Sequence, residues 1–153
     1  MGKQKKSRSK RDKRPIIPKE LTIQKVPRFF GEPNLEDRYL AWRFSKADLG
    51  GPYSCGTFTY DDFLMLWDKL RSFEKMNSAE LWKGGSFHEI SVGDIGKEAQ
   101  ARLQAVALDD VDYLYSFRMN ATCRLWCVKH ENLMSLLWWD KDHQVYPVSK
   151  KGT

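Results

Sequence analysis

Three apolar segments joined by short polar links lie within residues 111–139, and they constrain the fold more than any other feature of the chain. Apolar and polar residues alternate along residues 111–119 and 122–130, which is the two-residue period of half-buried strands. Residues 133–139 are apolar on both faces apart from Ser135, as expected of a central strand. Because links of two residues join antiparallel neighbours, these segments predict an antiparallel meander.

Two amphipathic helices are predicted ahead of the meander. Along residues 60–74 apolar side chains recur at helical spacing, and Thr59 is a suitable N-cap. A second stripe predicts a helix over residues 92–107. Residues 145–148 can add a short fourth strand, which Pro147 would keep at an edge. The predicted fold class is therefore α+β: two main helices followed by a three- to four-stranded antiparallel meander.

The positive charge of the chain is concentrated at its N-terminus. Residues 1–14 carry eight bases and one acid, whereas the other 139 residues carry 18 bases and 19 acids. A segment this charged, with no apolar residue after Met1, cannot offset the entropy cost of folding, so a disordered basic tail is predicted. Four prolines make residues 15–34 an extended connector, and residues 35–153 are predicted to form a single α+β domain.

A basic tail of this kind binds polyanions by releasing their counterions, so RNA or the ribosome is the predicted partner. The alternatives are a solvated tail that aids solubility, or a run that only resembles a nuclear-import signal. The tail residues predicted to contact RNA are Lys5, Lys6, Arg8, Lys10, Arg11, Lys13 and Arg14.

Composition excludes several classes of protein. No apolar run approaches the roughly 18–20 residues that span a bilayer, and no apolar segment follows the N-terminal charges as in a secretory signal, so we expect a cytoplasmic protein without membrane contact. Three cysteines are too few for a disulfide scaffold. On a strand Cys123 and Cys127 would share one face and His130 the other, so no metal site is expected. No glycine pattern indicates a nucleotide cofactor, and none is expected.

The densest group of reactive side chains directly follows the third predicted strand. His143 has an imidazole suited to general acid or base catalysis, Asp140 or Asp142 could orient it, and Tyr146 could supply a phenol. The alternative is a plain turn in which an aspartate caps the backbone. His88, ahead of the second predicted helix, is either a second imidazole near a helix N-terminus, where anions bind, or an ordinary exposed loop histidine.

The pairing of the strands decides which of these groups meet. If both links are two-residue turns, Arg118 lies opposite Cys123, and Cys123 lies opposite Asp140, all on one face, while Arg124 lies on the other. A slip of one residue in either hairpin breaks this arrangement. The cations of the body predicted to bind phosphate are Arg118, Arg124, Lys150 and Lys151.

Five stretches resemble a family of small uncharacterised bacterial and mobile-element proteins, over about residues 40–153. They are residues 42–44, 48–52, 97–103, 109–118 and 137–147. The most specific of them contains the pair Trp138-Trp139. This resemblance implies no established activity.

The order of helix, helix and meander is more distantly similar to the RelE/ParE/HigB toxin superfamily. In that superfamily two arginine-bearing strands and an apolar strand precede a histidine near a Val-Tyr pair. The corresponding residues here are Arg118, Arg124, residues 133–139, His143 and Val145-Tyr146. Ribosome-dependent members cleave mRNA without a metal, with cations supporting the phosphate transition state and a histidine or tyrosine moving protons.

The resemblance therefore implies an RNA-acting, toxin-like protein: a metal-independent, ribosome-associated mRNA endonuclease with an antitoxin protein as a partner. Its catalytic residues would be His143, Tyr146 and Asp140. The alternative is a non-enzymatic adaptor from a phage, plasmid or other mobile element that binds nucleic acid or protein. The sequence does not indicate an oligomeric state.

Overall fold

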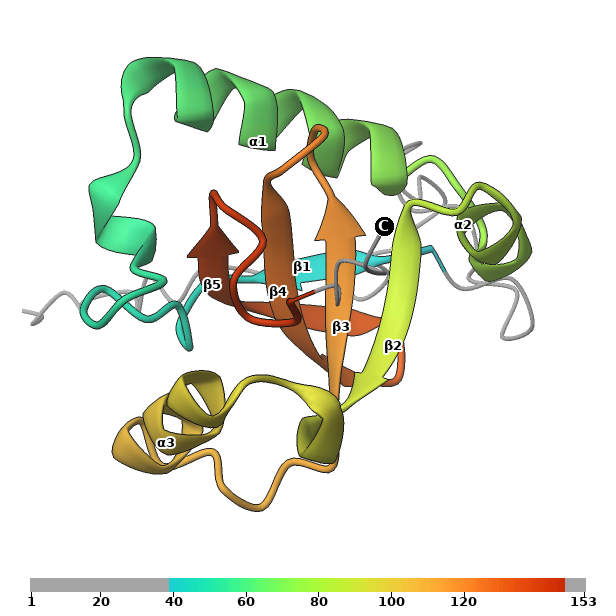
Figure 1. The fold of residues 1–153 in the computed structure, drawn as a ribbon. Helices are drawn as coiled ribbons and strands as arrows, with labels where there is room; N and C mark the ends of the chain where they lie inside the picture. Colours follow the sequence, from blue (N-terminus) through green and yellow to red (C-terminus); the bar gives the residue numbers. More distant parts are fainter. Residues whose placement is uncertain (1–38, 148–153) are drawn as a thin grey trace, which may run out of the picture. The chain divides into compact units, whose positions relative to one another are not determined.

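A five-stranded mixed sheet forms the centre of the computed structural model, which describes residues 39–147 (Figure 1). The chain divides into two units, Met1–Glu32 and Pro33–Thr153, and the described residues all belong to the second. The predicted tail (residues 1–14), the predicted connector (residues 15–34) and the two lysines at 150 and 151 lie outside the described residues.

The strands run in the order β1-β5-β4-β3-β2 across the sheet. Their bounds are β1, Ala41–Arg43; β2, Phe87–Ser91; β3, Tyr113–Arg118; β4, Arg124–His130; and β5, Leu133–Asp140. The predicted antiparallel pairing of the three C-terminal strands is confirmed. Strand β2 also pairs with β3 in the antiparallel direction. Strand β5 lies between β1 and β4, which agrees with its two apolar faces.

The prediction of a purely antiparallel sheet of three or four strands is wrong, because the sheet has five strands and β1 runs parallel to β5. Strand β1 is only three residues long, and its partner is about 90 residues away in sequence, so no local pattern identifies it. The predicted strand at residues 145–148 does not form over its described part, residues 145–147. There the backbone N–H of Val145 donates to the side chain of Asp140 instead of to a neighbouring strand.

Among residues 39–147, three α-helices flank the sheet: α1, Tyr60–Phe73; α2, Ser78–Lys83; and α3, Lys97–Ala105. The predicted N-cap of α1 is confirmed, since Thr59 and Asp62 exchange side-chain and backbone hydrogen bonds in a capping box. The helix predicted over residues 92–107 is shorter. Its first residues form a separate 3₁₀ turn, Val92–Asp94, before α3 begins.

The two faces of the sheet pack against different elements. Figure 1 shows α1 and α3 far apart, with the sheet between them. One face carries Phe117, Leu125 and Trp139, which form a core cluster with buried side chains of α1 and α2. The other face carries Leu114, Trp126 and Trp138 and shares a cluster with α3 and with the segment after β5. None of the described helices is long and apolar enough to cross a membrane.

Candidate functional site

The register of the meander differs by one residue from the predicted one, and this changes which side chains share a face. Arg118 on β3 pairs with Arg124 on β4, and Arg124 pairs with Asp140 on β5. The prediction that Cys123 lies between Arg118 and Asp140 is therefore wrong. Because facing residues project to the same side of a sheet, both arginines lie on one face.

The shift of β4 against β3 arises in their turn, which is longer than the two residues predicted. The side-chain oxygen of Asn120 accepts hydrogen bonds from the backbone N–H groups of Thr122 and Cys123, at 3.0 and 2.7 Å. The backbone N–H of Met119 donates to the carbonyl of Cys123 at 3.0 Å. Cys123 thus belongs to the closure of the turn, and β4 begins one residue later at Arg124.

The shift of β4 against β5 has another origin: His130 pairs with Leu133 as predicted for a two-residue turn, and the register changes at an irregularity between Trp126 and Cys127.

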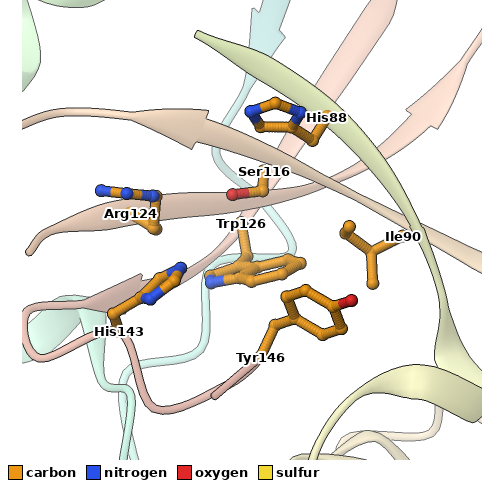
Figure 2. A pocket seen from close by; sticks show the side chains of 7 residues that line it. All are labelled: His88, Ile90, Ser116, Arg124, Trp126, His143 and Tyr146. Atoms are coloured by element: carbon orange, nitrogen blue, oxygen red, sulfur yellow. The ribbon is translucent and has the colours of Figure 1, made fainter. Parts of the chain in front are cut away.

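A pocket of about 280 Å³ opens on the sheet face that carries Arg124. Its lining comes from β2, β3, β4 and the turn after β5 (Figure 2). The lining residues are His88, Ile90, Ser116, Arg124, Trp126, His143 and Tyr146. Three of the predicted site residues, Arg124, His143 and Tyr146, are thus brought together, and His88 joins them from β2, which is an edge strand of the sheet.

The floor of the pocket is a row of facing residues on three strands. His88 pairs with Ser116, and Ser116 pairs with Trp126, so the Cα atoms of His88 and Trp126 are about 9.6 Å apart. Trp126 and Ser116 are buried, whereas His88 is exposed. Figure 2 shows the Trp126 indole in the middle, with His143 and Arg124 on one side and Ile90 on the other. The Tyr146 hydroxyl points towards Ile90, away from His143.

His88 lies within β2, not at a helix N-terminus, and so the anion-site interpretation made from the sequence is wrong for this histidine. The sequence analysis also missed Ser116, Trp126 and Ile90 as members of the site. Residues 87–91 do not alternate apolar and polar side chains, so no periodic signal in the sequence identifies β2 as a strand.

Asp140 holds the turn that carries His143. This buried carboxylate accepts the backbone N–H groups of Gln144 and Val145, at 2.8 and 2.9 Å, and the indole N–H of Trp126 at 3.3 Å. The turn needs such support because His143 has a φ of 55°, in the left-handed region. Asp140 therefore acts on the site by positioning His143 and does not line the pocket.

Replacing Asp140 with Ala should lower the free energy of unfolding by about 2 kcal/mol, because two backbone N–H groups and one indole N–H lose their acceptor. Urea denaturation followed by tryptophan fluorescence measures this change. Asp142, an exposed aspartate of the same turn, provides the matched control, and Asp142→Ala should change stability by less than about 0.5 kcal/mol. Equal effects of the two substitutions would contradict the positioning role of Asp140.

The two facing arginines concentrate positive charge beside the pocket. Like charges placed directly opposite each other across a sheet are destabilising. Within residues 39–147 neither guanidinium forms an ion pair with a carboxylate, and Arg124 donates only to the backbone carbonyls of Asn120 and Cys123, both at 2.9 Å. Burial and the charge of Arg118 lower the pKa of Arg124. An anion between these guanidiniums would relieve the repulsion.

Burial and the charges of the two arginines favour the neutral form of His143. Burial is the main cause that lowers the pKa of His143, and Arg124 and Arg118 add to it, while Asp140 opposes them. At neutral pH the imidazole therefore presents a nitrogen lone pair to the pocket. Beside two guanidiniums that form no ion pair among residues 39–147, this arrangement can bind a phosphate and remove a proton next to it.

No family model, curated protein or solved structure matches this chain. A functional assignment for the pocket therefore depends on its own geometry and charge.

Proposed function

We propose that this chain is an RNA-acting, toxin-like protein that cleaves mRNA without a metal ion, in association with the ribosome. One observation carries the proposal: two facing arginines without a carboxylate partner among residues 39–147 stand beside a neutral imidazole in a pocket. Phosphate recognition and proton abstraction, the two tasks of this reaction, are thereby assigned to adjacent side chains.

The chemistry that fits these groups is transfer of the phosphoryl group to the neighbouring 2′-oxygen of the RNA. His143 removes the proton of the 2′-hydroxyl, the 2′-oxygen bonds to phosphorus, and the bond from phosphorus to the 5′-oxygen breaks. The guanidinium of Arg124, supported by Arg118, stabilises the charge that develops on the phosphoryl oxygens. The products are a 2′,3′-cyclic phosphate and a 5′-hydroxyl end. Tyr146 bounds the pocket and is proposed to assist.

In this proposal the positive charge of residues 1–14 supplies the affinity for RNA or the ribosome that the pocket does not provide. Residues 1–14 carry a net charge of +7, and the rest of the chain carries −1, so non-specific attraction to RNA or the ribosome is assigned to these residues alone. An adaptor without catalytic activity is the second candidate, because this separation of charge would serve it equally well. It predicts that deletion of residues 1–14 abolishes binding and that substitution of His143 has no effect.

The proposal is tested by inducing the protein in bacteria while growth is followed and mRNA ends are mapped. Purified protein is then incubated with RNA in two ways: with ribosomes in a buffer that contains magnesium, and without ribosomes in the presence of a chelator. We expect growth arrest and RNA fragments with cyclic phosphate and 5′-hydroxyl ends. Intact RNA under all these conditions would overturn the proposal, as would cleavage of free RNA, without ribosomes, that stops on chelation.

Substitution of Arg118 with Ala should weaken RNA binding about tenfold and flatten its dependence on salt. Loss of one phosphate contact to single-stranded RNA reduces the slope of log affinity against log salt concentration by about 0.7. Arg43→Ala, which removes an exposed arginine from the far edge of the sheet, is the matched control and should leave both quantities unchanged. Fluorescence anisotropy with a labelled RNA measures both, and a salt slope unaltered by Arg118→Ala would contradict phosphate contact by this residue.

A further inference from the structure

The proposed reaction leaves one proton transfer without a residue. Breaking the bond to the 5′-oxygen produces an alkoxide, which is a poor leaving group unless it is protonated as it departs. His143 is occupied with the proton of the 2′-hydroxyl. A second proton-transfer group must then stand on the other side of the phosphorus, because the attacking and departing oxygens lie on opposite sides of it.

His88 reaches the same pocket from the opposite side. It is carried by β2, whereas His143 follows β5, and Figure 2 shows Ser116 and Trp126 between the two imidazoles. The pairing of β2 with β3 fixes its position, since His88 faces Ser116 directly. The exposure of His88 leaves its ring open to a ligand at the mouth of the pocket.

The hydrogen bond between the His88 ring and a backbone carbonyl defines which ring nitrogen is available for proton transfer. Its Nε2 lies 3.1 Å from the backbone carbonyl oxygen of Gly85. A carbonyl oxygen only accepts, so Nε2 carries a hydrogen and Nδ1 is left to exchange a proton with a ligand. Gly85 has a φ of 65°, a conformation that suits glycine, and this turn directs its carbonyl at the imidazole.

We propose that His88 is the general acid of this pocket, which donates the proton on Nδ1 to the departing 5′-oxygen of RNA. The inference rests on the proposed function. When the reaction is complete the 2′-oxygen is bonded to phosphorus, the 5′-oxygen carries the proton from His88, and His143 carries the proton of the 2′-hydroxyl. Solvent returns both imidazoles to their initial states. The substrate class is RNA and not DNA, because the attacking group is the 2′-hydroxyl.

The test compares two RNA substrates that differ in one atom. In the second substrate the bridging 5′-oxygen at the cleavage point is replaced by sulfur, which departs without protonation because the pKa of a thiol is only about 8.5. His88→Gln removes the acid and retains an amide that can donate to the Gly85 carbonyl. His130→Gln is the matched control, since His130 is an exposed histidine on β4 outside the pocket.

We expect His88→Gln to slow cleavage of the oxygen substrate about 10²-fold and to leave cleavage of the sulfur substrate within about threefold of wild type. His130→Gln should cleave both substrates at the wild-type rate. Equal losses on the two substrates, or no loss on either, would overturn the assignment of His88 while the proposed function stands. If the wild-type protein cleaves neither substrate, with or without ribosomes, the proposed function fails and the assignment of His88 fails with it.

Discussion

Replacing His143 with Asn is expected to reduce RNA cleavage about 10³-fold while changing the free energy of unfolding by less than about 1 kcal/mol. Asn is the replacement of choice because the backbone at His143 has a φ of 55°, and Asn enters this region more readily than most residues. It cannot accept a proton at neutral pH. The substitution therefore removes the base and preserves the turn that Asp140 supports.

The pH dependence of cleavage gives a second measurement of the same residue. A base must be deprotonated, so the rate should fall as the pH is lowered through the pKa of His143. Burial and the nearby guanidiniums lower that pKa, which places the midpoint of the fall below the usual value of about 6.5. In Arg124→Gln one of those positive charges is lost, and the midpoint should move to higher pH.

Single-turnover cleavage by wild type, His143→Asn and Arg124→Gln across this pH range tests both expectations. His130→Asn is the control for loss of an imidazole outside the pocket. Wild-type activity in His143→Asn would remove His143 as the base. A midpoint in Arg124→Gln that stays at the wild-type pH would show that this guanidinium does not act on His143.

The parts of the fold that could be predicted are those encoded by neighbouring residues. The alternation along β3 and β4 and the cap of α1 by Thr59 and Asp62 need no knowledge of the rest of the chain. Strand β1 becomes a strand only by pairing with Leu133–Ser135, far along the sequence. The register of β3 and β4 also escaped prediction, because an apolar Cys123 suggests a strand although the Asn120 side chain accepts its backbone N–H.

As with the fold, the parts of the candidate site that could be predicted are those encoded by neighbouring residues. His143 and Tyr146 follow a strand whose position the sequence indicates, and both line the pocket. Arg124 was predicted to lie on the face opposite to Arg118 and Asp140, and this error follows from the wrong register of β3 and β4. That His88 lies in the same pocket depends on the pairing of β2 with β3, and no local feature of the sequence contains that information.

The convergence of three separate stretches on Asp48 was also beyond sequence analysis. Residues 48–52, 97–103 and 137–147 each contribute to one buried cluster. The Asp48 carboxylate accepts two hydrogen bonds from Arg102, at 2.8 and 2.7 Å, and one each from the Trp138 indole and the Gly50 backbone, both at 3.0 Å. The Arg102 side chain passes so close to Gly51 that a Cβ atom there would lie 2.4 Å from its Nε.

We therefore expect Asp48→Ala to lower the free energy of unfolding by about 3 kcal/mol, because it leaves a guanidinium and a buried indole N–H without their acceptor. The hydrogen bonds from Arg102 are the main cause that holds the pKa of Asp48 below its ordinary value. A carboxylate with a lowered pKa in the folded protein stabilises it at neutral pH, and this contribution is lost as the pH falls below about 4.

Urea denaturation at pH 7 and at pH 3 measures both effects, with Asp68→Ala, an exposed aspartate of α1, as the control. The difference between wild type and Asp48→Ala should be largest at pH 7 and smaller at pH 3, where the wild-type carboxylate begins to take up its proton. Arg102→Lys should retain only part of the stability that the pair of Arg102 and Asp48 provides in the wild-type protein, because an ammonium cannot form the paired hydrogen bonds of a guanidinium. Equal effects of the Asp48 and Asp68 substitutions at pH 7 would show that the cluster does not stabilise the fold. A difference independent of pH would show that its contribution does not depend on the charge of Asp48.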